Sequence, residues 1–331
     1  MLLDPLQARL WLADALARGY AILAVNADSP AALTDCLEAA RQAQAPIIIE
    51  TSLWQLTGHS FGAGDPVRGL VRYLVQLSGL ANAEPYREIP VIFHTDHIKG
   101  PETLRILGAA IRGVEANICG SEAKVFASTV SLDSSEMTEG ENIARTSELC
   151  ELARVAGRPL TIEMEAGVDA GVTEIEVAER LLAPVEETHP GCLYLWAPGV
   201  GTQHGLSDRG YPFSPDAVAL HREKATAICG RPIGIALHGS SGLAASALRE
   251  GVAAGVAKVN WSSESLLIRC QAAQEYFASR SAELQKSHPA WKATAMDHGL
   301  QAFVSARYVP KVIERIEILG GVGKACLPER C

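Results

Sequence analysis

Short apolar runs recur along the whole chain, and a longer segment with helical periodicity follows most of them. Most runs are continuously apolar rather than alternating, as expected for strands whose two faces are both covered. Ser29-Pro30 and Ser214-Pro215 are typical helix starts, with a capping serine and a proline at the first helical position. The predicted strands are 20–25, 46–50, 90–95, 124–129, 160–165, 193–197, 232–237 and 257–261.

Eight strands that alternate with helices predict an α/β protein of the (β/α)₈ type, a TIM barrel. A doubly wound sheet is disfavoured because the first turn, "VNADSP", lacks the GxGxxG pattern. We predict one barrel domain over residues 1–331, with 263–331 as a C-terminal helical extension that caps the barrel or packs on a partner subunit. The 51–89 stretch is expected to be an insertion that forms a lid or a subunit contact.

Composition narrows the class of protein. The 331 residues are 48% hydrophobic, enough for a large core, and the formal charge is −9 with acidic and basic residues interspersed. No basic block is present, so neither nucleic acid nor a membrane surface is an expected partner. The N-terminus does not resemble a secretory signal, and no uncharged run reaches the roughly 18 residues of a membrane span. Eight scattered cysteines without a CxxC pair favour a cytoplasmic enzyme.

Polar residues gather where the predicted strands end. The stretch "VIFHTDHIKG" alone fits a metal site, a catalytic carboxylate or an ordinary polar strand end. The carboxyl ends of barrel strands surround one pocket, so residues at successive strand ends are expected to face each other. The acids, histidines and amide at the ends of the third to eighth strands are Asp96, His97, Asp133, Glu163, Glu165, His204, His238 and Asn260.

Three histidines on one rim indicate a metal centre. Imidazole nitrogens suit Zn²⁺, and three protein ligands with one open position form the usual catalytic arrangement. We therefore predict His97, His204 and His238 as zinc ligands. The chain has no HExxH motif and no cysteine cluster, so this hypothesis depends on the barrel. His94 is interpreted as a supporting residue below the rim.

Glycine and serine follow the last two histidines and the eighth strand, in "GTQHG", "HGSSG" and "NWSSES". Small residues let backbone N–H groups approach a phosphate, and hydroxyls near a helix start add donors. One such loop alone would be an ordinary turn. Adjacent loops beside a metal triad favour a phosphate site, which in barrels often follows strands seven and eight.

These motifs together resemble the class II, zinc-dependent ketose-bisphosphate aldolases, typified by fructose-bisphosphate aldolase. The likeness covers nearly the whole chain. The similar segments, in the family's order, are "YAILAVNADSPAALTDCLEAARQAQAPIIIETS", "HTDH", "LDSS", "ENIARTSEL", "IEMEAG", "GTQHG", "LHGSSG", "AKVNWSSES" and "IERIEILGGVGKA". The resemblance implies reversible cleavage of a ketose (bis)phosphate to dihydroxyacetone phosphate and an aldehyde, through an enediolate whose charge zinc stabilises. It also implies a homo-oligomer, dimer or tetramer.

The resemblance gives individual residues a role. Asp96 matches the acid/base that handles the proton on the aldehyde-derived oxygen. Asp133 and Glu165 match carboxylates at a secondary position for a divalent or monovalent cation. Asn260 matches a ligand of the ketose hydroxyl. Ser52 matches a substrate-binding position near the donor phosphate. The positions that match the contacts of the donor phosphate itself are Gly205, Gly239, Ser240, Ser241, Ser262 and Ser263.

The chain also departs from the family. Two adjacent acids normally supply the base for the substrate carbon, but this chain has Thr173 and Glu174 at those positions. Glu174 is therefore the expected base, with Glu176 as the second choice. Trp261 is an unusual bulky neighbour of Asn260, and Arg209 stands in a loop that normally carries a Tyr-Lys-Gly turn. These changes leave the metal ligands in place but alter substrate contacts.

Three alternatives remain open at this point. The first is an aldolase for a different ketose phosphate, of the tagatose type or an atypical sugar. The second is a metal-binding barrel that has lost activity and serves as a partner subunit. A zinc hydrolase is ranked last, because "AVNADS" lacks the HxH pair expected after its first strand.

Overall fold

The computed structural model of the protein describes residues 1–118, 120–167, 169, 171–206 and 212–327. Eight parallel strands form a closed barrel in the order β1-β2-β3-β6-β7-β8-β9-β10, which confirms the predicted TIM barrel. Their interiors are buried because helices cover the outside and side chains fill the inside. The barrel strands are β1 Ile22–Asn26, β2 Ile47–Thr51, β3 Val91–Ile98, β6 Thr129–Leu132, β7 Ile162–Ala166, β8 Leu193–Pro198, β9 Gly234–Leu237 and β10 Val256–Trp261.

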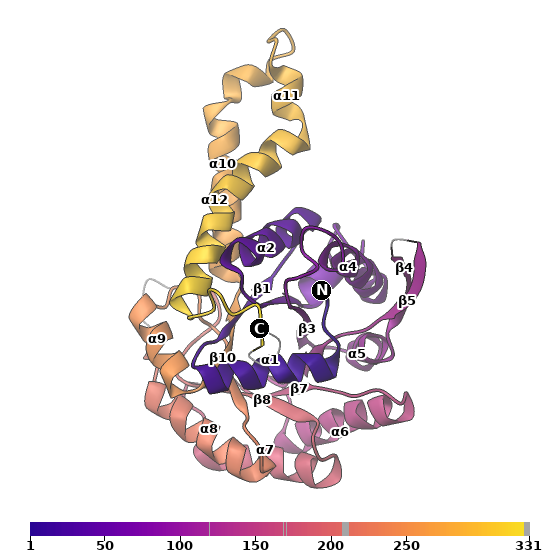
Figure 1. The fold of residues 1–331 in the computed structure, drawn as a ribbon, viewed down its shortest axis with the longest axis vertical. Coiled ribbons are helices and arrows are strands. Elements are labelled where there is room, and N and C mark those ends of the chain that lie inside the picture. Colours follow the sequence, from indigo (N-terminus) through magenta and orange to yellow (C-terminus); the bar gives the residue numbers. More distant parts are fainter. Residues whose placement is uncertain (119, 168, 170, 207–211, 328–331) are drawn as a thin grey trace.

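Helices surround the barrel on its outer face (Figure 1). The serine-proline starts behave as expected: Ser29 accepts a hydrogen bond from the Ala32 N–H, and Ser214 accepts one from Ala217, which satisfies donors that the helix leaves unpaired. The helices between strands are α2 Pro30–Ala43, α3 Leu53–Thr57, α4 Pro66–Ala81, α5 Thr103–Arg112, α6 Glu139–Val155, α7 Ile175–Thr188, α8 Pro215–Cys229 and α9 Ala245–Ala254.

An N-terminal helix, α1 (Pro5–Arg18), lies across one mouth of the barrel (Figure 1). Trp11 and Leu12 of this helix are buried and belong to one cluster with the inward residues of the strands, among them Ile48 and Leu195. The helix therefore closes the end of the barrel opposite the carboxyl ends of the strands, so the open mouth is the one at which the polar residues gather.

The fourth barrel strand differs from its prediction. Residues 124–129 were expected to form it, but the barrel strand is β6, Thr129–Leu132. The preceding Ser121–Val125 (β5) pairs antiparallel with Val114–Ile118 (β4) in a hairpin outside the barrel. Glu115 faces Lys124 across this hairpin, a charged alternation typical of an exposed ribbon rather than of a covered strand.

The expectation that 51–89 is an insertion forming a lid is also wrong for most of that stretch, whereas a subunit contact there stays a prediction. Helix α4 is the regular helix of the second β/α unit, and Leu70, Tyr73, Leu74 and Leu77 are buried in the main core. The short helix α3 and the start of α4 at Pro66 reach the open mouth of the barrel.

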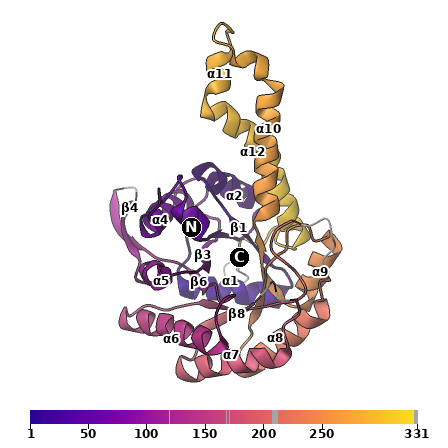
Figure 2. The same ribbon diagram turned by 180° about the vertical axis from the view of Figure 1, so that it is seen from behind.

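The C-terminal extension forms an arm that projects away from the barrel (Figures 1 and 2). Its elements are α10 Ser263–Ser279, the 3₁₀ helix η2 Ser281–Leu284, α11 Trp291–Ala295 and α12 Asp297–Ile318. The second half of α12 returns to the barrel, where Tyr308, Val312 and Ile316 join the core. The extension thus completes the helical layer beside β1 and does not cover the open mouth.

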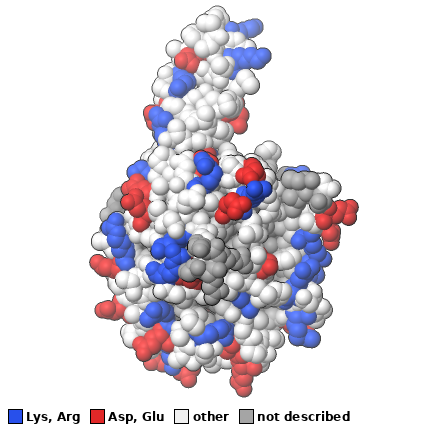
Figure 3. All heavy atoms as spheres, in the orientation of Figure 1, with Lys and Arg blue, Asp and Glu red and all other residues white. Residues whose placement is uncertain are grey.

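The surface matches the composition. On the face drawn in Figure 3, Lys and Arg side chains alternate with Asp and Glu side chains. Within the described part of the chain, no helix combines the length and apolar character needed to cross a bilayer.

A glycine in α4 allows α3 to pack closely against that helix. A Cβ on Gly69 would lie 1.9 Å from the Leu56 carbonyl oxygen of α3, whereas a Cβ on Gly79 of the same helix meets nothing within 4 Å. We expect Gly69→Ala to lower the free energy of unfolding by about 1–3 kcal/mol through overpacking, measured by urea unfolding. Gly79→Ala is the matched control and should raise it by about 0.5–1 kcal/mol. Equal effects of the two substitutions would contradict this packing.

Candidate active site

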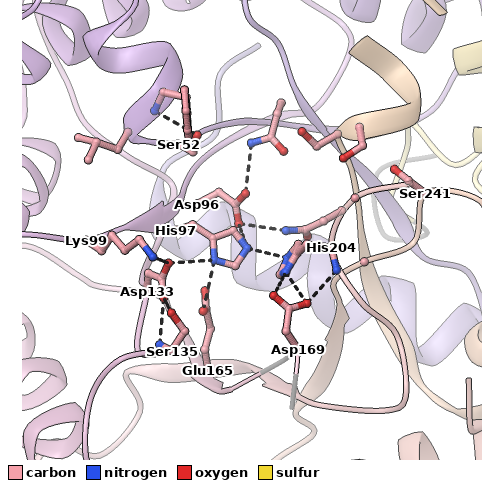
Figure 4. A pocket seen from close by; sticks show the side chains of 18 of the residues that line it. Ser52, Asp96, His97, Lys99, Asp133, Ser135, Glu165, Asp169, His204 and Ser241 are labelled. Carbon is pink, nitrogen blue, oxygen red and sulfur yellow. Dashed lines mark hydrogen bonds and ion pairs between the residues drawn. The ribbon is translucent and has the colours of Figure 1, made fainter. Parts of the chain in front are cut away.

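The open mouth of the barrel contains a cavity of about 410 Å³ lined by residues from most of the strand ends. Figure 4 shows its side chains converging from the β3, β6, β7, β8 and β9 sides. The predicted site residues that line it are Ser52, Asp96, His97, Asp133, Glu165, His204, Gly205, Gly239, Ser240, Ser241, Asn260, Ser262 and Ser263. His238 lies directly beneath them, buried and in contact with His97.

A bulge at the end of β3 brings two sequential residues to this cavity. Neighbours in a regular strand point to opposite faces, so Asp96 and His97 could not both face inward. The β3–β6 register shifts between Thr95 and Ile98, and His97 has a φ of +49°, in the left-handed region. A left-handed conformation costs a non-glycine residue roughly 1–2 kcal/mol. The surrounding structure holds His97 in this strained conformation at a functional position.

Three imidazole rings meet at one point in the cavity. The His97 Nε2 lies 3.1 Å from the His204 Nε2 and 2.9 Å from the His238 Nδ1. Two nitrogens that share a tetrahedral zinc at about 2.0–2.1 Å would stand roughly 3.3 Å apart. The three histidines come from β3, from the loop after β8 and from the end of β9, as the strand-end argument expected.

Each imidazole has a carboxylate near its other nitrogen. Glu163 lies 2.7 Å from the His238 Nε2, and both Asp169 oxygens lie 3.0 Å from the His204 Nδ1. A Glu165 oxygen lies 3.6 Å from the His97 Nδ1. Such carboxylates fix the proton on the outer nitrogen and leave the inner lone pair for a metal. The three imidazoles therefore suit Zn²⁺ both in the type of ligand atom and in the tautomer that the carboxylates favour.

Burial supports this tautomer for His238. Burial lowers the pKa of His238 to about 4, although hydrogen bonding to Glu163 acts in the opposite direction. The ring is therefore neutral near pH 7, and its single proton lies on Nε2, which faces the Glu163 carboxylate. The Nδ1 lone pair remains free to point at the centre of the triad.

Asp96 is held between two amides. Its Oδ2 accepts a hydrogen bond from the Asn26 side chain at 3.2 Å, and its Oδ1 accepts one from Asn260 at 3.0 Å. Burial opposes ionisation, but electrostatic interactions with His97 and Lys258 outweigh it and hold the pKa of Asp96 below its usual range. Asp96 is therefore an ionised, oriented carboxylate beside the triad.

A fully buried lysine lies below the rim. The Lys258 Nζ is 2.8 Å from Glu163 and 3.3 Å from Glu50, and all three side chains are inaccessible to solvent. Burial lowers the pKa of Lys258, but the carboxylates of Glu163 and Glu50 reverse this and raise it above its usual value. The same ammonium keeps the pKa of Glu163 well below its usual range against the effect of burial. Lys258 is thus a charged ion-pair partner.

His94 belongs to this lower layer, as expected. Its ring is buried, with Nδ1 2.7 Å from the Thr129 hydroxyl and Nε2 3.7 Å from Glu163. Burial and the charge of Lys258 lower the pKa of His94 to about 3, so the ring is neutral.

The two carboxylates expected at a secondary cation position lie side by side near His97. Burial and the neighbouring charges of Glu163 and Asp96 raise the pKa of Glu165 well above its usual value. The Glu165 Oε1 is buried without a hydrogen-bond partner, as expected of an atom available to a cation. Asp133 accepts hydrogen bonds from the Ser135 N–H and hydroxyl, and lies 3.5 Å from the Lys99 Nζ.

The glycine-serine loops form the wall above β9 and β10. Gly239 has a φ of +63°, and a Cβ there would lie 2.5 Å from the Gln203 carbonyl oxygen, so the close approach of the two loops requires glycine. The Ser241 hydroxyl accepts from the Glu264 N–H, and Ser262 precedes the first turn of α10. Backbone N–H groups and a helix start thus lie in the position expected for an anion.

A buried arginine lies behind this wall, and no motif or periodicity in the sequence predicted it. The Arg315 guanidinium of α12 donates to the Ser240 carbonyl at 2.8 Å and lies 3.5 Å from Glu264. Trp261, expected to intrude beside Asn260, is instead buried outside the cavity lining, stacked on Tyr308, and donates to Glu264. Its bulk therefore does not narrow the described part of the site.

The loop after β7 leaves the predicted base outside the lining of the cavity. Glu174, predicted as the base for the substrate carbon, is exposed at the N-terminus of α7 and does not line the cavity, and Glu176 is also exposed. Glu174 is the N-cap residue of α7, and its side chain makes no capping hydrogen bond to that helix. The carboxylate that this loop brings to the cavity is Asp169, which the sequence analysis missed. Arg209 lies outside the described residues.

Comparisons with known proteins agree with this fold and site. The sequence profile of the family "Fructose-bisphosphate aldolase class-II" matches residues 7–324. A fructose-bisphosphate aldolase from Streptococcus pyogenes is 28% identical over 316 residues, which cover 93% of this chain and 94% of that protein. A fructose-bisphosphate aldolase from Streptococcus pneumoniae is 27% identical over 316 residues, which again cover 93% of this chain and 94% of that protein.

Two solved structures share the fold. Fructose-bisphosphate aldolase from Campylobacter jejuni superposes with a TM-score of 0.80 at 22% identity, covering 98% of this chain and 97% of that one. The YdjI aldolase from Escherichia coli K12 gives a TM-score of 0.70 at 23% identity, covering 98% and 100% of the two chains.

The barrel and its polar rim define an enzyme of the (β/α)₈ class, with a group of residues able to hold a metal at the mouth. The chain belongs to the class II fructose-bisphosphate aldolase family. It is therefore an aldolase, a carbon–carbon lyase.

The geometry of the triad gives a test of metal binding. We expect His238→Ala to reduce zinc per protein chain by more than about tenfold, because it removes one of three inward lone pairs. Metal content of the purified protein, measured by mass spectrometry after dialysis against buffered zinc, checks this. His59→Ala, an exposed histidine outside the cavity, is the matched control and should leave the content unchanged. Unchanged zinc in the His238 variant would refute the triad.

Proposed function

We propose that the protein cleaves a ketose phosphate reversibly to dihydroxyacetone phosphate and an aldehyde, with Zn²⁺ held by His97, His204 and His238. The observation that carries this proposal is the meeting of three imidazole lone pairs beside the ionised Asp96. A zinc ion bound there would act as a Lewis acid for the carbonyl and hydroxyl oxygens of the substrate.

The side chains around the triad would do the rest of the chemistry. In the cleavage direction, Asp96 takes the proton from the hydroxyl on the carbon that becomes the aldehyde. The carbon–carbon bond then breaks and its electron pair forms the enediolate of the three-carbon product. Asn260, 3.0 Å from Asp96, is placed to bind a ketose hydroxyl and to keep Asp96 oriented. A second carboxylic acid finally protonates the enediolate carbon.

The donor phosphate would lie against Gly205, Gly239, Ser240, Ser241 and the start of α10 at Ser262 and Ser263. The anchoring surface combines backbone N–H groups with the buried charge of Arg315 behind it. Ser52 lies on the opposite wall, where its hydroxyl bonds to Gln55 and caps α3. Asp133 and Glu165 are proposed as the secondary cation position.

Exchange of the carbon-bound proton of dihydroxyacetone phosphate with deuterated water tests this function without any aldehyde. We expect zinc-loaded protein to catalyse both this exchange and aldol addition, and a chelator to abolish both until zinc is restored. NMR follows the exchange, and a coupled dehydrogenase assay follows cleavage. Bound zinc without exchange or cleavage of any ketose phosphate would instead identify an inactive metal-binding subunit.

The same exchange assay assigns the base for the carbon. Asp169 contacts His204 and lies in the cavity, whereas Glu174 is exposed, so we expect Asp169→Asn to lower exchange by about 10- to 100-fold. Glu174→Gln, in the same loop, should retain most of it. Loss of exchange in the Glu174 variant with normal exchange in the Asp169 variant would return the role to Glu174.

We further infer a homo-oligomer assembled through the arm. Large apolar side chains are exposed there, including Phe277, Trp291 and Met296. An arm that projects from the barrel without covering the site is suited to contacts with a second copy. Light scattering should give a dimer or tetramer, and a monomer at micromolar concentration would contradict this inference.

A further inference from the structure

A second cavity of about 540 Å³ adjoins the one at the triad. The two share Leu53, Lys99 and Asp133 in their walls, so they are direct neighbours at the open mouth of the barrel. The Asp133 carboxylate lies 3.8 Å from His97 on one side and 3.5 Å from the Lys99 Nζ on the other. Figure 4 shows Lys99 and Asp133 on the side of the triad away from Ser241.

This position fits the half of the substrate that leaves as the aldehyde. The glycine-serine wall proposed for the donor phosphate belongs to β9 and β10, whereas the second cavity is bounded by α3 and by the loops after β3 and β6. A ketose phosphate that spans Asp96 would place its phosphate on the first wall and its far carbons in the second cavity.

The wall of the second cavity is poor in free positive charge. Among its described lining residues Lys99 is the one cation, and the same lining contains three carboxylates, those of Glu102, Asp133 and Glu136. Lys99 is already paired with Asp133 and donates to Glu136 at 3.1 Å. The nearby guanidinium of Arg105 is paired with Glu102 and with Asp65.

The remainder of this wall is largely apolar. Leu53, Pro66, Pro101 and Met137 line it together with Gly64, Gly100 and Thr57. A phosphate placed here would lose water, meet a net negative wall and find no unpaired cation among the described residues. Like charges about 4 Å apart near a protein surface repel each other.

We propose that this second cavity is the acceptor subsite and that it takes an uncharged aldehyde, so that the substrate carries one phosphate, on the donor half. This inference rests on the proposed function and specifies its substrate class. A chain of hydroxylated or apolar carbons without a terminal phosphate or carboxylate matches both the charge and the lining of the wall.

A pair of acceptors that differ in one phosphate tests the inference. The zinc-loaded protein is assayed at low ionic strength for aldol addition of dihydroxyacetone phosphate to glyceraldehyde and to glyceraldehyde 3-phosphate. We expect kcat/KM to favour glyceraldehyde by at least about tenfold. Glu136→Lys reverses an exposed charge on the wall and should reduce this ratio by about tenfold.

Glu115→Lys is the matched control. Glu115 is as exposed as Glu136 and likewise pairs with a lysine, but it lies on the β4–β5 hairpin outside both cavities. This variant should leave the ratio unchanged. A preference for glyceraldehyde 3-phosphate, or for an aldehyde bearing a carboxylate, would overturn the acceptor inference.

Deuterium exchange into dihydroxyacetone phosphate needs no acceptor aldehyde, so it tests the proposed function separately from the acceptor subsite. Exchange with a preference for the phosphorylated aldehyde would refute the acceptor subsite alone. Absence of exchange would refute the proposed function and the subsite with it.

Discussion

The ion pair between Lys258 and Glu163, buried inside the barrel, is the interaction on which the site depends. A buried ammonium loses several kcal/mol of hydration, and only well-placed carboxylates compensate for it. Glu163 also accepts from His238 and lies near His94, so one carboxylate serves the lysine and a proposed metal ligand together. Removing either partner would leave an uncompensated charge beneath the triad, which typically costs about 3–5 kcal/mol.

This ion pair also determines which of the neighbouring side chains carry a proton. Glu163 is ionised because Lys258 is beside it, and the pKa of Glu50, which contacts the same ammonium, is nevertheless raised well above its usual value by burial and by Asp96. The carboxylates of the lower layer therefore do not all carry charge. An ionised Glu163 fixes the proton of His238 on Nε2, which turns the other nitrogen of the ring toward His97 and His204.

Much of this arrangement could be predicted from the sequence, for a physical reason. Strands of a parallel barrel end at one mouth, so Asp96, His97, His204 and His238 could be brought together by counting strands alone. The fourth strand was misplaced because the apolar run 125–127 was taken as its centre, whereas the barrel strand begins at Thr129 and the pairing of Glu115 with Lys124 reveals a hairpin. Asn26 ends β1 and obeys the same rule, but it was not taken as a site residue.

Other site residues had no comparable signal. Arg315 reaches the glycine-serine wall from a helix more than seventy positions after Ser240, and no periodicity connects the two. Asp169 lies between β7 and α7, away from the strand ends on which the prediction relied. Matching by sequence spacing therefore selected Glu174, which the start of the helix turns outward.

The bulge at His97 explains why the roles of Asp96 and His97 could not be assigned from the stretch "VIFHTDHIKG" alone. A regular strand would bury either Asp96 or His97 away from the cavity, and the two roles proposed for them require both on one side. The left-handed backbone at His97 achieves this at a conformational cost of roughly 1–2 kcal/mol. Contacts from Asn26, Asn260, Glu165 and His238, on four other strands, hold the pair in place. The strain is therefore offset by the closed barrel, and the proton carrier stands next to the metal ligand only in the complete fold.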